Sequence, residues 1–211
     1  MEIVLPLLLG FFVASVGIIP PGLINMTAAK VSIKDGRSKA ISFSIGASSV
    51  IFLQTILALL FAKYIDSKPD FIVILQEIGL FFFLALTAYF FWISRKPKRP
   101  KEELKIRSNS NRFFLGMLLS GLNLFPIPYY VFVSITLSTY NYFFFDNGFI
   151  YPFVLGVVLG SFFVFYLYII FFKKEGKTST FIIANANTII GSITGVISLI
   201  TILKLIKQYW N

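Results

Sequence analysis

The sequence has no cysteine and no histidine among its 211 residues. Without cysteine there are no disulfides, no thiol redox chemistry and no thiolate metal sites, and without histidine the chain lacks the commonest metal ligand and neutral-pH base. Acidic residues are also few, 9 against 19 lysines and arginines. Because neither paired carboxylates nor a histidine dyad is evident, we expect no enzyme, no metal site and no cofactor.

Charge is scarce as well. Only 13% of the residues are charged and 57% are hydrophobic, whereas a soluble domain carries about 25% charged residues. Long apolar stretches recur, each able to cross a hydrocarbon core of ~30 Å as a helix. The sequence predicts an all-α integral membrane protein with six transmembrane helices, at 3–28, 40–62, 71–94, 113–137, 149–172 and 181–205. The first stretch lacks a basic start, so we interpret it as a membrane helix and not as a signal peptide.

The basic residues predict an orientation. Of the 19 lysines and arginines, 15 lie in the connections after the first, third and fifth predicted spans. The positive-inside rule places these connections in the cytoplasm and both termini outside. The net charge of +10 is therefore attributed to topology and lipid headgroups, and no nucleic-acid partner is expected. The densest basic stretch, 95–112, is interpreted as a cytoplasmic linker between two halves, 1–94 and 113–211.

The two halves resemble each other weakly. Gly10 stands ten residues before Pro20, and Gly116 stands ten residues before Pro126. With three spans in each half, the second half enters the membrane with opposite polarity, as in the inverted repeats of many secondary transporters. We therefore predict two inverted three-helix repeats. Chance similarity between apolar helices is the competing explanation.

Small residues recur at helix-packing spacing. Gly156 and Gly160 form one G-x-x-x-G pattern, and Gly191 and Gly195 form another. Gly160 is also our match in the second half for Gly46 of the first. The pattern lets helix backbones approach closely, either within one bundle or between two copies in a homodimer.

Helix-disrupting residues interrupt the first and fourth predicted spans well inside their length: Pro20, Pro21 and Gly22 in the first, and Pro126 and Pro128 in the fourth. Proline removes a main-chain hydrogen bond and frees a carbonyl. Bare main-chain groups are tolerated at membrane depth only where protein or a wet cavity covers them. We therefore expect the two breaks to face each other and form a substrate-binding and gating site.

Three polar residues complete the candidate site. Asn25 follows the first break and Asn123 precedes the second, and their amides offer donors and acceptors suited to a zwitterionic ligand. The alternative is that these amides only cap the freed carbonyls. Glu77 is an acidic residue within the third predicted span. It is a candidate for ion coupling, or else an interfacial glutamate.

The first span and the loop after it resemble the lysine-exporter (LysE-type) amino-acid translocator family. Pro21 and Gly22 match the start of its motif, Gly36 with its basic neighbour follows Pro21 by fifteen residues, and Gly46 follows ten residues later, although Leu23 replaces the second proline. The size, the six apolar segments and the basic centre extend the resemblance over essentially the whole chain. It implies a secondary transporter that exports amino acids or similar small polar metabolites across a bacterial inner membrane by alternating access, driven by an ion gradient.

Two alternatives stay open at this point. An exporter of metal or inorganic ions lacks its usual ligands here, because histidine, cysteine and dense acidic clusters are missing. A non-transporting scaffold does not explain why both halves carry helix breaks at matched positions. The expected partners are a small polar solute and the lipid bilayer.

Overall fold

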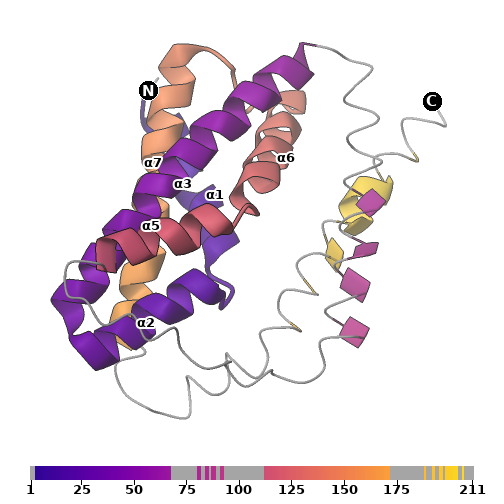
Figure 1. The fold of residues 1–211 in the computed structure, drawn as a ribbon. Helices are drawn as coiled ribbons and strands as arrows, with labels where there is room; N and C mark the ends of the chain where they lie inside the picture. Colours follow the sequence, from indigo (N-terminus) through magenta and orange to yellow (C-terminus); the bar gives the residue numbers. More distant parts are fainter. Residues whose placement is uncertain are drawn as a thin grey trace. The chain divides into compact units, whose positions relative to one another are not determined.

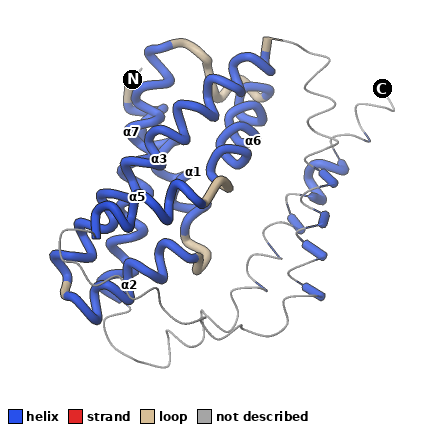
Figure 2. Tube along the Cα trace, in the orientation of Figure 1, coloured by secondary structure: helices blue, strands red, loops and turns tan. Residues whose placement is uncertain are grey.

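The computed structural model describes residues 3–67 and 112–171 without interruption, together with separate short pieces within 80–92 and 188–206. In these ranges all regular structure is helical, as predicted (Figures 1 and 2). The helices are α1 (Val4–Ile18), α2 (Leu23–Asp35), α3 (Arg37–Asp66), α5 (Arg112–Leu122), α6 (Pro126–Thr139) and α7 (Asn147–Phe171).

The chain divides into two compact units. One consists of Met1–Tyr64 and Ile106–Gly176, and the other of Ile65–Lys105 and Lys177–Asn211. Each unit draws on both sides of the basic segment 95–112. The predicted halves, 1–94 and 113–211, are defined by sequence alone and are not the same as these units. The division into halves stays a prediction.

Two helices of the first unit are long and apolar enough to cross a membrane. These are α3, with 30 residues and a mean hydropathy of 2.1, and α7, with 25 residues and a mean hydropathy of 2.5. At 1.5 Å per residue both exceed the ~30 Å of a hydrocarbon core. They coincide with the predicted spans 40–62 and 149–172.

The first and fourth predicted spans are each two helices joined at a sharp bend. The axes of α1 and α2 differ by 81°, and those of α5 and α6 by 62°. The bends fall at the prolines, so the sites of interruption are as predicted, but a continuous helix over 3–28 or 113–137 is not observed (Figure 2). Each pair is a broken span or a re-entrant loop. The predicted spans 71–94 and 181–205 lie mostly outside the described residues.

Glycines let α1 and α7 approach at backbone distance. A Cβ atom on Gly10 would lie 2.1 Å from the carbonyl oxygen of Phe153, and one on Gly156 would lie 2.0 Å from that of Leu7. A Cβ on Gly160 would also collide with α1, at 2.4 Å from a carbonyl oxygen. Such contacts leave room only for Cα hydrogens against carbonyl oxygens. Gly156 and Gly160 therefore act in packing within the chain.

The same arrangement joins α3 and α5. A Cβ on Gly116 would lie 2.0 Å from the carbonyl oxygen of Phe43, and one on Gly46 would lie 2.1 Å from that of Phe113. Gly10 is thus paired with Gly156, and Gly116 with Gly46. In each pair, a glycine faces the carbonyl of the residue three positions before the other glycine. By this criterion the counterpart of Gly46 is Gly156, one helical turn before the Gly160 suggested by sequence comparison.

Candidate functional site

The first break is held together by Asn25. Its amide nitrogen donates to the carbonyl oxygens of Ile18 (2.8 Å) and Pro20 (2.9 Å), and its amide oxygen accepts from the N–H groups of Gly22 (2.6 Å) and Met26 (3.1 Å). Asn25 is 3% exposed. Both amide hydrogens are thus committed to main-chain carbonyls at the break, although not to those of Val16 and Gly17, whose usual donors the prolines replace, so the side chain shapes the break.

Two tyrosines from other helices donate to main-chain carbonyls around the same break. The hydroxyl of Tyr168 in α7 donates to the oxygen of Ile19 at 2.7 Å, and that of Tyr129 in α6 donates to the oxygen of Val13 at 2.9 Å. The Tyr129 ring lies against Gly17, where a Cβ would come within 2.8 Å of the ring carbons. Two main-chain carbonyls around the first break, those of Val13 and Ile19, are therefore satisfied by side chains of other helices.

The structure places the end of α1 close to the start of α6. Gly17 lies three residues before Pro20, and Tyr129 lies three residues after Pro126. Their contact places the end of α1 against the start of α6. That the two breaks face each other and form one substrate-binding and gating site stays a prediction.

The second break is held by a residue that the sequence analysis did not single out. Gln54 of α3 donates its amide hydrogens to the carbonyl oxygens of Ser120 (3.1 Å) and Asn123 (2.9 Å). Asn123 takes part through its main chain, since its N–H also donates to carbonyls of the preceding turn. Its side chain is half-buried.

The prolines of the second break occupy the first turn of α6. Pro126 is half-buried and Pro128 is exposed. Proline fits a helix start because the missing N–H would lack an intrahelical partner there. The N–H groups of Ile127 and Tyr129 donate to nearby carbonyls at 3.2 and 3.3 Å. The start of α6 therefore offers few free donors.

The start of α2 is different. Its first residues, Leu23 and Ile24, have N–H groups without an intrahelical acceptor, as at any helix start. Gly22 is exposed and Leu23 is 65% exposed. Just upstream, Pro20 and Pro21 lack the N–H groups that would otherwise donate to the carbonyls of Val16 and Gly17. The first break thus combines main-chain donors at a positive helix end with main-chain acceptors.

Charged and polar side chains connect α2, α3, α5 and α7 near the α2–α3 turn. Asp35 and Arg112 form an ion pair of 2.6 Å, and the guanidinium of Arg37 donates to the Tyr166 hydroxyl and lies 5.0 Å from its ring centroid. Gly36 between the helices has a φ of +93°, a backbone conformation that favours glycine. Residues of the first and third predicted connections therefore lie close together in this unit.

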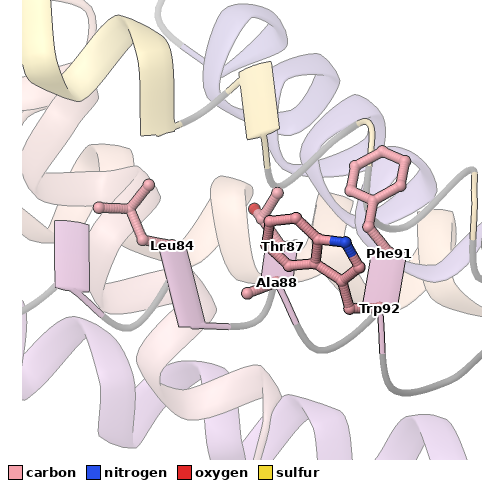
Figure 3. Close-up of a pocket in the computed structure, with 5 residues that line it drawn as sticks. All are labelled: Leu84, Thr87, Ala88, Phe91 and Trp92. Atoms are coloured by element: carbon pink, nitrogen blue, oxygen red, sulfur yellow. The ribbon is translucent and has the colours of Figure 1, made fainter.

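The second unit contains an open hollow of about 560 Å³ (Figure 3). Its lining is apolar apart from the hydroxyl of Thr87 and the indole nitrogen of Trp92, and consists of Leu84, Thr87, Ala88, Phe91 and Trp92. The ion-coupling candidate Glu77 lies outside the described residues. In the parts of the chain that are described, no group of three acidic residues is placed to hold a metal ion.

Comparison with known proteins gives one finding. The family model described as LysE type translocator matches residues 15–206. No curated protein and no solved structure matches the chain.

Proposed function

Because the chain belongs to the LysE type translocator family, we propose that it is a secondary transporter that exports amino acids or similar small polar metabolites. The family assignment makes the protein a membrane transporter and not an enzyme. The proposed details are the solute class, export across a bacterial inner membrane, and alternating access with the two helix breaks as substrate-binding and gating site.

The observation that supports this proposal most is the contact of Gly17 in α1 with Tyr129 in α6, each three residues from a proline of its break. At the first break, the start of α2 offers N–H groups and partial positive charge to a carboxylate. The carbonyls of Val16 and Gly17, whose usual donors are replaced by prolines, offer acceptors to an ammonium group. An amino acid carries these two groups on adjacent atoms, so it fits a site of mixed main-chain donors and acceptors.

The paired glycine contacts support the inverted-repeat part of the proposal. In the first half Gly10 packs against α7, which belongs to the second half. In the second half Gly116 packs against α3, which belongs to the first half, with the same offsets. In each case a helix of one half packs against a helix of the other half at matched positions. A two-fold relation between the halves produces such a pattern. Rocking of such halves about a shared site is a general route to alternating access.

The ion pair of Asp35 with Arg112 supports the predicted topology. It joins Asp35 within the first basic connection to Arg112 at the end of the third. Both connections are rich in lysine and arginine and are assigned to the cytoplasm by the positive-inside rule. The proposal therefore keeps both termini on the outer side.

The test is efflux of labelled amino acids from preloaded proteoliposomes. We expect Pro21→Ala, Asn25→Ala, Asn123→Ala and Pro126→Ala to insert but to lose export. Pro152→Ala is the matched control, because Pro152 lies inside α7 and away from both breaks. Normal export by all four break variants would refute the assignment of the site.

A further inference from the structure

Two buried polar atoms beside the second break have no hydrogen-bond partner. They are Oε1 of Gln54 and Oγ of Ser120. Gln54 is 6% exposed and Ser120 is fully buried. Both belong to the α3–α5 interface, because the amide nitrogen of Gln54 is 3.1 Å from the carbonyl oxygen of Ser120. A buried polar atom without a partner is costly, so its presence calls for an explanation.

The orientation of the Gln54 amide is determined by its surroundings. Its nitrogen faces two carbonyl oxygens, those of Ser120 and Asn123. Exchanging the amide nitrogen and oxygen would place an acceptor against two acceptors. The oxygen is therefore the free end, and it can only accept.

Most buried serines in the described helices donate to a carbonyl of their own helix, whereas Ser120 does not, a property that it shares with Ser48 of α3. Ser44, Ser134 and Ser161 each donate to the carbonyl four residues earlier, at 3.0, 2.7 and 2.7 Å. The Ser120 hydroxyl makes no such bond to the carbonyl of Gly116. Its oxygen is thus left available within the interface.

The matched position in the other half shows that packing alone does not require these groups. Ser120 stands four residues after Gly116, and Ala14 stands four residues after Gly10. On the facing helices, Gly116 lies against Ala47 and Gly10 lies against Val157. Gln54 follows Ala47 by seven residues, and Val164 follows Val157 by seven residues, so Val164 is the counterpart of Gln54. Ala14 and Val164 are fully or almost fully buried and apolar. The polar pair is therefore specific to one of two otherwise similar interfaces.

The charge of the surroundings selects the ligand. Ser120 lies in the last turn of α5, where helix carbonyls carry partial negative charge. The start of α6 opposite has few free N–H donors, because Pro126 and Pro128 have none. An anion is disfavoured there. The groups that could coordinate a ligand are neutral oxygens. Divalent cations normally require carboxylates, so a monovalent cation fits these oxygens better.

We propose that Gln54 Oε1 and Ser120 Oγ, with carbonyl oxygens near the end of α5 that do not accept from the Gln54 amide, bind a dehydrated alkali cation such as Na⁺. This inference deepens the proposed function, on which it rests, by supplying a coupling ion for the exporter. Cation coordination by unwound carbonyls and half-helix C-terminal ends is a general device of transporters with broken helices. Both side chains are buried, which suits an ion better than the amine of a larger solute.

The experiment measures equilibrium binding of ²²Na⁺ to the purified full chain in detergent, without amino acids. We expect saturable binding by the wild type, and Ser120→Ala and Gln54→Ala to weaken it by about tenfold each. Ser120→Ala removes one hydroxyl where the matched interface has alanine, so it is expected to fold. Ser44→Ala is the control, because this buried serine of α3 is satisfied by its own helix.

The outcomes separate the cation site from the exporter. Absence of saturable ²²Na⁺ binding by the wild type, or equal binding by the Ser120→Ala, Gln54→Ala and Ser44→Ala variants, would overturn the cation site. Binding of labelled methylammonium but not of ²²Na⁺ would also overturn it, because the pocket would then serve the amine of a solute. Amino-acid efflux from proteoliposomes is measured separately in sodium-free buffer with a proton gradient and in sodium buffer. Export without ²²Na⁺ binding would refute only the cation site, whereas ²²Na⁺ binding without export of any amino acid would refute the proposed function.

Discussion

Replacing Asn25 with alanine should destabilise the protein because this amide holds the first break. It makes four hydrogen bonds, to the carbonyls of Ile18 and Pro20 and from the N–H groups of Gly22 and Met26. The Met26 N–H keeps a second acceptor, the carbonyl of Gly22 at 3.1 Å. Three main-chain groups thus lose a partner, and each buried group left unsatisfied costs about 1–3 kcal/mol. Because Gly22 is exposed and the other groups are only partly buried, we expect a loss of about 3 kcal/mol, the lower end of the sum.

The assay is reversible unfolding of Asn25→Ala in mixed detergent micelles, followed by tryptophan fluorescence or circular dichroism. Asn123→Ala is the matched control, because the hydrogen bonds that the structure describes at the second break use only the main chain of Asn123. Its cost should stay below about 1 kcal/mol. Unchanged stability of Asn25→Ala together with lost export would refute the reasoning, since Asn25 would then be a solute ligand and not the support of the break.

Three further predictions concern packing, tyrosine hydrogen bonding and the ion pair. Gly116→Ala should destabilise the protein by about 2 kcal/mol or more because the new Cβ meets a carbonyl of α3 at 2.0 Å. Gly121→Ala on the same helix has open space around it and should be neutral or stabilising in the same unfolding assay. Equal effects of the two substitutions would be inconsistent with the close approach of α3 and α5. Tyr168→Phe should cost about 1 kcal/mol by removing a hydrogen bond to a carbonyl of the first break, measured as a lowered unfolding free energy, and no change would mean that water replaces the hydroxyl without loss. A double-mutant cycle of Asp35→Ala and Arg112→Ala should give a coupling energy of about 0.5–1 kcal/mol that falls with added salt, because both side chains are partly exposed; a zero coupling would show that the ion pair does not join the two connections.

The locations of the breaks could be predicted from the sequence, because proline acts locally. Pro21 and Pro126 mark the interruptions whatever surrounds them. The angle of each bend could not be predicted, since it depends on the contacts of α2 and α6 with other helices. The predicted span 3–28 therefore covers what are in fact two helices at 81°.

The side chains that donate to main-chain carbonyls around the breaks were only partly predictable. Asn25 was foreseen in both of its possible roles, because its acceptors lie within a few residues. Gln54, Tyr129 and Tyr168 reach carbonyls between 66 and 149 residues away in sequence. Such pairings leave no periodic or spacing signal. For Gln54 the available hint was a single amide in an otherwise apolar stretch of α3.

The central claim is that the two breaks form one water-accessible site for the exported solute. The chain has no cysteine, so single cysteines can be introduced directly at Leu23 and Leu124, each 65% exposed and each at one break. Leu53, 60% exposed on α3, is the control. The measurement is labelling of Leu23→Cys, Leu124→Cys and Leu53→Cys in proteoliposomes with a membrane-impermeant thiol reagent, with and without exported amino acid. We predict that the two break cysteines react and that the amino acid protects both, while the cysteine at position 53 stays unlabelled. Break cysteines that resist the reagent, or that react equally with and without every amino acid that the protein exports, would contradict the claim.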